Sequence, residues 1–196
     1  METETWPTCP QRPNFSVLTG FLTPGSDTGP GALDGSISLD VLDPTEHDEK
    51  VLALETTDPW SLLVRWCVCG RFADLVSGCW CVQVFLDDID GVETPGRRTG
   101  RIGSKKVSAD DGIEVSEGED TTTFCFKTRF DFGAPGAVQA GVYNLVVVIT
   151  LSNRDCDDPA RTVQDMVGWA VIPVLVFFDE KAPFCPPLER SPWPIT

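Results

Sequence analysis

Four of the eight cysteines lie in two short apolar stretches, a pattern that suits either metal binding or disulfide formation. They are Cys67, Cys69, Cys79 and Cys81. In each stretch the cysteines alternate with large apolar residues, among them Trp66 in the first and Trp80 in the second. A β-strand points alternate side chains to opposite faces, so each pair of cysteines shares a face opposite its tryptophan.

The connection 71–78 is short enough to join the two stretches as an antiparallel hairpin. A symmetric register places Cys69 opposite Cys79 and Cys67 opposite Cys81, with Cα atoms about 4.5–5.5 Å apart, which a disulfide can span. Four thiols on one face also form a candidate zinc site, although Cys-x-Cys on a straight strand spaces the ligands poorly for a tetrahedral ion. The simplest interpretation is small side chains packed on a semi-buried face, and all three alternatives stay open.

Two acidic loops form a candidate calcium site. The carboxylates are Asp87, Asp88, Asp90, Asp155, Asp157 and Asp158. Each loop follows a predicted strand, and loops that meet at one end of the fold would supply the oxygen ligands that calcium prefers. The spacing does not match an EF-hand loop, and solvated turn carboxylates are the simpler interpretation.

Catalysis has little support in the sequence. His47 is the only histidine and lies in a charged turn, with no Gly-x-Ser-x-Gly motif to accompany it. Neither a dinucleotide-binding nor a phosphate-binding glycine motif is present. We therefore expect a protein that is not an enzyme and has no cofactor, with zinc and calcium as the alternatives. A hydrolase or redox enzyme that uses His47 or the thiols is a third interpretation.

Length and composition favour a single domain with few helices. The chain has 196 residues, enough for one well-cored domain, and its 17 glycines and 16 prolines interrupt it densely. The formal charge of −15 opposes binding to nucleic acid or to an anionic membrane. Residues 1–20 lack the features of a secretory signal, and no apolar run reaches the roughly 20 residues that span a bilayer. We expect a soluble, cytoplasmic protein.

Alternating apolar residues predict strands along the central part of the chain. The predicted strands are 37–42, 51–55, 61–70, 79–87, 121–131, 142–152 and 169–178, with a helical turn at 162–166. In 61–70 and 79–87 one face is wholly apolar, and the other carries the cysteines with Arg65 or Gln83. The apolar faces belong in the core, so the cysteines lie on the far side. Pro173 indicates an edge position or a bulge in the last strand.

These elements predict an all-β protein, an antiparallel immunoglobulin-like β-sandwich of about seven to nine strands at 37–178. The segment 1–36 is rich in proline and glycine and is predicted to be an extended N-terminal arm. The segment 179–196 carries five prolines and is predicted to be a C-terminal docking tail. The charged insertion 91–120 is either a loop or a hairpin of weak strands.

Aromatic residues near the termini indicate contact surfaces. Trp6, Phe15, Phe184 and Trp193 are candidate anchors on a partner, and docking on the chain's own domain is the alternative. We predict a non-catalytic β-sandwich module that joins a larger assembly through its terminal arms and one sheet face, with a protein partner or by self-assembly. The alternatives are a sandwich that binds calcium or another polar ligand through its acidic loops, and a zinc-stabilised or redox module.

Overall fold

The computed structural model describes most of the central domain and parts of the N-terminal segment. The described residues are 6, 15–17, 33–44, 49–71, 73–89, 100–115, 122–133, 138–152 and 164–179. Within these ranges the helical elements are two short 3-10 turns, and none is long and apolar enough to cross a membrane. The prediction of an all-β protein is confirmed.

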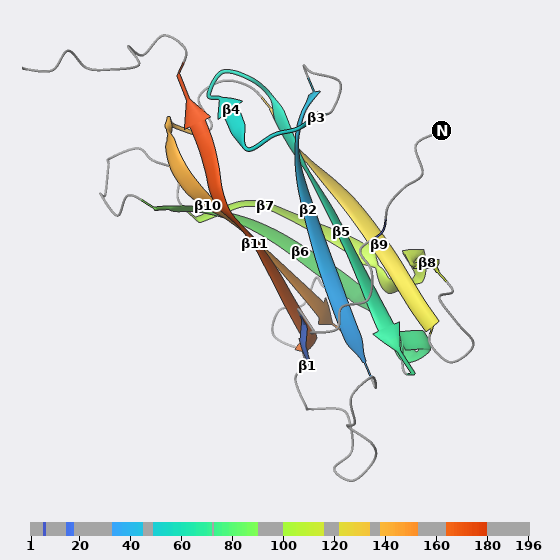
Figure 1. Ribbon diagram of the computed structural model, residues 1–196. Helices are drawn as coiled ribbons and strands as arrows, with labels where there is room; N and C mark the ends of the chain where they lie inside the picture. The colour runs from blue at the N-terminus through green and yellow to red at the C-terminus, as the bar shows by residue number, and fades with distance from the viewer. Residues whose placement is uncertain are drawn as a thin grey trace, which may run out of the picture.

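Eleven described strands form two sheets that face one another (Figure 1). The strands are β1 (Phe15–Val17), β2 (Asp34–Asp43), β3 (Glu49–Lys50), β4 (Ala53–Glu55), β5 (Trp60–Gly70), β6 (Cys79–Asp88), β7 (Gly100–Ser108), β8 (Ile113–Glu114), β9 (Thr122–Phe132), β10 (Gly141–Ser152) and β11 (Gln164–Phe178). The turns η2 (Ala73–Leu75) and η3 (Ala109–Asp111) lie between β5 and β6 and between β7 and β8. We call the sheet with order β1-β11-β10-β6-β7 sheet A and the sheet with order β3-β2-β5-β9-β8 sheet B; β4 also pairs with β11.

The core lies between the sheets and follows the predicted alternation. On β5 and β6 the wholly apolar faces are at most 1% exposed; they comprise Leu62, Val64, Trp66, Val68, Trp80, Val82, Val84 and Leu86. Trp66 and Trp80 meet edge to face across the two sheets, with ring centroids 5.9 Å apart. Phe126 of β9 stacks on Trp66 at 5.4 Å and lies 5.5 Å from Trp80. This aromatic cluster joins the two sheets at their centre.

The predicted hairpin between β5 and β6 is wrong, because the two strands belong to different sheets. β5 lies between β2 and β9, and β6 lies between β10 and β7. Gly70 and Gly78, at the two ends of the connection, have φ angles of 128° and 106°, a region that favours glycine. A hairpin would direct both apolar faces to the same side, where a further layer must cover them. In facing sheets the two faces cover each other.

Two further predictions differ from the structure, and one about the last strand is confirmed. β7 pairs with β6 and β8 pairs with β9, so the charged insertion does not form a hairpin of its own. β11 begins at Gln164, which makes the predicted helical turn wrong for residues 164–166. The register of β10 and β11 shifts beside Pro173, which confirms a bulge there.

Gly112, which follows η3, gives a test of the packing around the aromatic cluster. A Cβ atom at this position would lie 2.8 Å from two ring atoms of Phe126, which is itself stacked on Trp66. We expect Gly112→Ala to lower the free energy of unfolding by about 1–3 kcal/mol, because an overpacked ring must shift.

The control is Gly133→Ala, since a Cβ atom at Gly133 would have nothing within 4 Å. Urea unfolding followed by tryptophan fluorescence measures both variants. Equal stability of the two variants would contradict this account of the cluster.

Candidate functional site

The outer faces of the two sheets differ in chemistry, and each carries cysteines. We call the outer face of sheet B the polar face. Its cross-strand rows are Ser36–Cys67–Cys125, Ser38–Arg65–Lys127, Asp40–Leu63–Arg129 and Leu42–Ser61–Asp131. We call the outer face of sheet A the apolar face. Its rows are Val171–Val146–Phe85–Arg101, Trp169–Val148–Gln83–Ser104 and Val167–Thr150–Cys81–Lys106.

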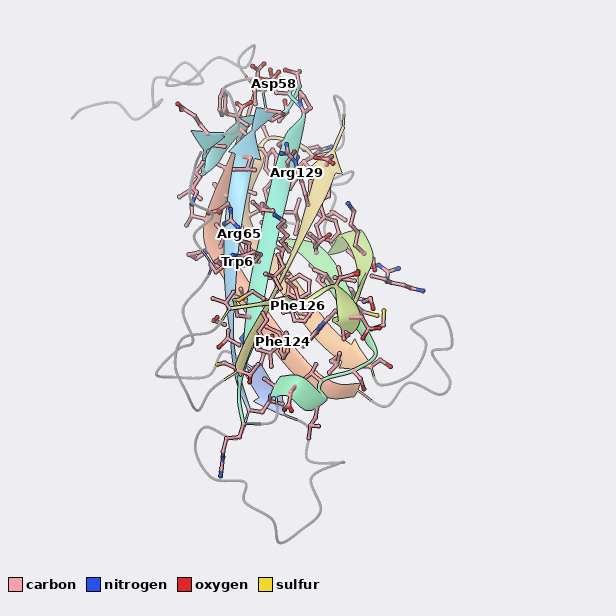
Figure 2. The ribbon with its side chains drawn as sticks, turned by 90° about the vertical axis from the view of Figure 1, so that its right-hand side faces the viewer. Trp6, Asp58, Arg65, Phe124, Phe126 and Arg129 are labelled. Carbon is pink, nitrogen blue, oxygen red and sulfur yellow. A yellow bond between two sulfur atoms is a disulfide. The ribbon has the colours of Figure 1, made fainter. Side chains whose placement is uncertain are left out.

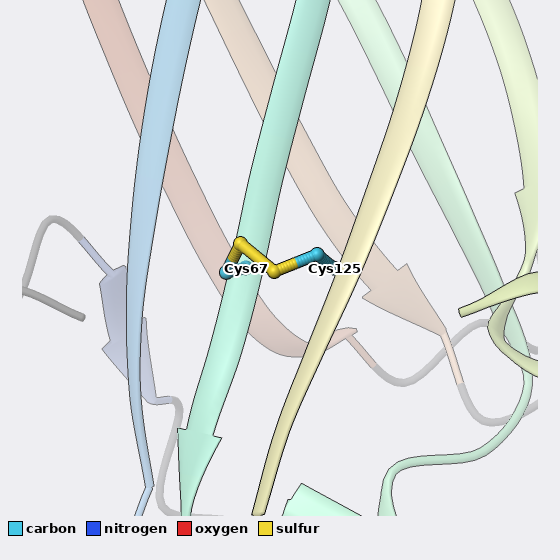
Figure 3. Close-up of a disulfide and its surroundings, with 2 residues drawn as sticks. All are labelled: Cys67 and Cys125. Atoms are coloured by element: carbon cyan, nitrogen blue, oxygen red, sulfur yellow. A yellow bond between two sulfur atoms is a disulfide. The ribbon is translucent and has the colours of Figure 1, made fainter. Parts of the chain in front are cut away.

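A disulfide joins Cys67 of β5 to Cys125 of β9 on the polar face (Figure 3). The two residues are direct partners in the β5–β9 register, and their Cα atoms are 4.1 Å apart. Cys67 is 0% exposed and Cys125 is 1% exposed, although both point away from the core between the sheets. The face of these cysteines agrees with the sequence analysis, whereas the partner of Cys67 does not.

The other cysteines of the predicted cluster are divided between the two sheets. Cys69 and Cys79 are disulfide-bonded as well, and Cys81 carries a half-buried thiol. Because β5 and β6 belong to different sheets, the four residues do not share one face. No group of three or more metal-ligating side chains gathers among the residues that the structure describes. The disulfides take up thiolates that a four-cysteine zinc site requires.

Ion pairs connect charged side chains on the polar face, where Figure 2 labels Arg65 and Arg129. The carboxylate of Asp40 is 2.5 Å from Arg65 Nη1 and 2.9 Å from Lys50 Nζ, and the side chains of Asp40 and Arg65 are 11% and 14% exposed. Arg129 donates from Nε to Asp131 Oδ1 at 2.8 Å and from Nη2 to Ser61 Oγ at 2.9 Å. The Ser61 hydroxyl donates to Asp131 Oδ1 at 2.9 Å. The charges of this face are therefore largely neutralised within the chain.

These contacts shift two carboxyl pKa values. Burial alone raises the pKa of Asp40, but the hydrogen bonds from Lys50 and Arg65 and the charges of both outweigh it, so the pKa is lowered. Hydrogen bonds from Arg129 and then Ser61 lower the pKa of Asp131. Both carboxylates are held in their charged form.

Trp6 lies against the polar face of its own domain. Lys127 Nζ is 5.8 Å from the centroid of the Trp6 ring, and Figure 2 places Trp6 beside Arg65, the residue directly opposite Lys127 in the β5–β9 register. Docking on the chain's own domain was one of the two interpretations of this residue. Of the other candidate anchors, Phe15 lies in β1, which pairs with β11, while Phe184 and Trp193 lie outside the described residues.

The apolar face exposes large side chains to solvent. Trp169 is 51% exposed, and Val171 and Val174 are each 49% exposed. Val148 and Val146, which lie opposite Trp169 and Val171, are half-buried, and so is Phe85 of β6, which lies opposite Val146. Apolar side chains therefore extend from β11 over β10 to Phe85. Soluble proteins rarely leave so continuous an apolar surface uncovered.

Sequence reasoning did not find this face. The signal was the lack of alternation in β10 and β11, which are apolar on both sides. Such strands are usually covered on both faces. Here the sandwich covers only one of them.

The two acidic loops of the calcium hypothesis begin at opposite ends of sheet A. Asp88 pairs with Tyr143 near the start of β10, whereas Ser152, at the end of β10, pairs with Cys79. The nine residue steps from Cys79 to Asp88 correspond to about 30 Å of strand. A site that combines both loops is therefore not supported, because β6 and β10 are antiparallel. Asp87 is exposed on β6; Asp90, Asp155, Asp157 and Asp158 lie outside the described residues.

A cavity lies near η2 and η3. It measures about 180 Å³ and is lined by apolar residues, including Phe124 and Phe126, with Asp74 and Asp110. Small-molecule sites typically occupy about 300–1,000 Å³. The lining contains no cysteine or histidine, and His47 lies outside the described residues.

Comparison with known proteins adds little. No protein-family model matches the sequence, and no curated protein matches it either. One similar solved structure is the crystal structure of a variant of BcpA, the major pilin subunit of Bacillus cereus. It is 12% identical with a TM-score of 0.34, and the match covers 75% of this chain and 41% of that chain. A likeness at this level carries no conclusion about function.

The Cys67–Cys125 disulfide should contribute strongly to stability. Its sequence separation is 58 residues, and closing a loop of this length restricts the unfolded chain. We expect the double substitution Cys67→Ala with Cys125→Ala to lower the free energy of unfolding by about 2–4 kcal/mol.

Cys81→Ser is the matched control, because it changes a half-buried thiol on the other sheet. Urea unfolding under non-reducing conditions measures both proteins. A double variant as stable as the control would show that the disulfide does not stabilise the fold.

Asp40 should make stability depend on pH. Its pKa is lowered in the folded chain, so its contribution is present above the unfolded value near 3.9 and is lost as the pH falls through the folded value. We expect Asp40→Asn to destabilise the protein at pH 7 and the difference from the unsubstituted chain to shrink between pH 4 and pH 2.

Urea unfolding at a series of pH values measures this difference. Asp74→Asn, at an exposed position in η2, serves as the control. A difference that stays constant from pH 7 to pH 2 would contradict the assignment to Asp40.

Proposed function

We propose that this chain is a non-catalytic, immunoglobulin-like β-sandwich module that joins a protein assembly through its apolar face. The observation that carries the proposal is the apolar surface that extends from β11 over β10 to Phe85 of β6, with Trp169 and Val171 about half exposed. Burying an exposed valine or larger apolar side chain contributes about 1.5–3 kcal/mol. Burial of this face by a partner would therefore make a large favourable contribution to the free energy of association.

The strand order supports the immunoglobulin-like description. Among the seven long strands, taken in chain order, the first, second and fifth (β2, β5 and β9) share sheet B. In constant-type immunoglobulin domains the fourth strand joins that sheet as well. Here the fourth long strand, β7, pairs with β6 in sheet A instead. The arrangement differs from the constant type by the position of one edge strand.

The polar face is less suited to docking than the apolar face. Its charged side chains are paired with one another, and Trp6 already lies on it. On the apolar face the charged side chains at the β7 edge are basic, Arg101 and Lys106, both exposed. The partner is therefore a protein surface that is apolar at its centre and acidic where it meets β7.

The disulfides support a site of action outside a reducing compartment. Cys67, Cys69 and Cys79 are all disulfide-bonded, and disulfides persist mainly in oxidising environments. We infer an oxidising compartment in place of the cytoplasmic location expected from the sequence.

A double substitution on the apolar face tests the function. In extracts of cells that produce the tagged chain, we expect the unsubstituted protein to elute in a species larger than a single chain of 21.4 kDa. Trp169→Lys with Val171→Lys should reduce that species at least tenfold, because two charges would be buried at the contact.

Leu75→Lys is the matched control, since Leu75 is 70% exposed in η2 and lies off the apolar face. Near-ultraviolet circular dichroism establishes that both variants are folded. A folded double variant that stays in the large species overturns the proposal, as does an unsubstituted protein that elutes alone.

A further inference from the structure

We propose that the outer edge of β2 binds an extended segment of a partner protein, which adds to sheet B as one further strand. β2 lies at the edge of its sheet, and β3 pairs only with its last two residues, Leu42 and Asp43. This edge is separate from the apolar face, which is the outer side of sheet A. The contact is therefore additional to the proposed function, and either of the two can be absent without the other.

The backbone of β2 offers unpaired hydrogen-bonding groups along this edge. Val51 N donates to the Val41 carbonyl at 2.9 Å, so Val41 directs its backbone groups away from β5. Because these directions alternate along a strand, Ile37 and Leu39 direct their N–H and C=O groups the same way. They face no other strand among those that the structure describes. Unpaired groups of this kind are a template for an added strand.

The spacing between β5 and β9 leads to the same alternation. The Cα atoms of Cys67 and Cys125 are 4.1 Å apart, close to the value of about 4.5 Å for a pair that shares no backbone hydrogen bonds. Cys67 therefore exchanges its backbone hydrogen bonds with Ser36, its partner on β2. Ile37, the next residue of β2, then directs its own backbone groups outward.

The side chains beneath this edge are incompletely covered. Ile37 and Leu39 of β2 and Ile172 of β11 pack against the core but are only half-buried. Val41 points to the same side of β2 and is 2% exposed, and it lies where the backbone of Val51 covers the edge. A strand added beside Ile37 and Leu39 would cover them in the same way, which gives the association an apolar contribution.

The other edges carry features that oppose strand addition. In β11, Pro173 has no N–H and lies at a bulge. On β7, Lys105 pairs with the buried Val82 and points inward, and its ammonium group donates to the Arg129 carbonyl of β9. Prolines, bulges and inward-pointing charges all block edges against further strands. Residues 35–39 of β2 contain no proline and no charged residue.

The neighbouring strands of sheet A favour a single strand over the sheet edge of a second copy. β11 lies beside β2, and on its outer edge it pairs with β1 at Met166–Gly168 and with β4 at Val176–Phe178 (Figure 1). Facing sheets lie about 10 Å apart at a small angle, so a second copy paired along β2 would bring its own β11 against β1 and β4. An isolated extended segment avoids this clash.

The surroundings indicate the composition of the segment. Its inward side chains would contact the half-buried isoleucine and leucine side chains, so they are apolar, and β-branched residues suit a strand. Its outward side chains would lie beside Ser36 and Ser38, to which hydroxyl side chains can hydrogen-bond. Asp40 needs no charged partner, because Arg65 and Lys50 already neutralise it. The segment thus alternates apolar and uncharged polar residues.

Amide hydrogen exchange followed by NMR tests the proposal on the full chain. The probe is a synthetic peptide of about seven residues that alternates threonine and valine. In the free chain, we expect the amides of Ile37 and Leu39 to exchange faster than those of Ser36 and Ser38, which donate to β5. The peptide at about 1 mM should slow exchange at Ile37 and Leu39 about tenfold and leave Ser36 and Ser38 unchanged.

Two substitutions at one position provide the matched comparison. Ile37→Pro removes an outward N–H and should abolish the protection of Leu39 by the peptide. Ile37→Ala shortens the same side chain but keeps the N–H, so Leu39 should remain protected. Near-ultraviolet circular dichroism establishes that both variants are folded. If the proline variant does not fold, exchange in the unsubstituted chain with and without peptide decides the matter.

Several results would overturn the proposal. Slow exchange at Ile37 and Leu39 in the free chain would show that a segment of the same chain occupies the edge. Exchange that slows as the protein concentration rises would show a second copy there. Exchange that the peptide does not change, or equal protection in the proline variant, would exclude strand addition. Trp169→Lys with Val171→Lys should leave the peptide effect intact, which separates this edge from the apolar face.

Discussion

The contact between Trp66, Phe126 and Trp80 is the constraint on which the rest of the structure depends. Trp66 and Phe126 come from sheet B and Trp80 comes from sheet A, and each is at most 3% exposed. Because side chains alternate along a strand, the residues that meet here determine which residues lie outside. The inner contact therefore places the disulfide on the outer side of sheet B and the valines of the apolar face on the outer side of sheet A. The two cysteines are buried there, whereas Val171 is about half exposed.

Much of the fold could be predicted from local pattern. The alternation in β5 and β6 gave their bounds to within one residue and placed their cysteines opposite the core. Which strands pair with one another could not be predicted in this way. The alternation shows only that an apolar face must be buried, and both a hairpin under a further layer and two facing sheets would bury it. The partner of Cys67 illustrates the difficulty, since Cys125 is separated from it by 58 residues and becomes adjacent only through the β5–β9 register. The apolar face was not predicted, because strands that are apolar on both sides, as β10 and β11 are, are usually covered on both faces.

The two outer faces of the sandwich differ in how far their side chains are satisfied within one chain. On the polar face, Asp40 and Arg65 neutralise one another while largely buried, and leaving either one alone there would be costly. Such a face is complete within one chain. On the apolar face, Trp169 and Val171 gain little from their own domain, so the favourable term is available to another surface. The alternating strands of sheet B thus give a face whose charges are largely neutralised within the chain, whereas β10 and β11, apolar on both sides, leave large apolar side chains exposed.

The cross-strand disulfide also has a mechanical consequence. An unfolded residue adds about 3.4 Å to the length of a chain under tension. The bond between Cys67 and Cys125 closes a loop over a separation of 58 residues, so roughly 200 Å of chain stays out of reach of a pulling force until the bond breaks. A force applied at the two ends would therefore lengthen this domain far less than its residue count suggests, and β5 and β9 would remain side by side even after every hydrogen bond between them had opened.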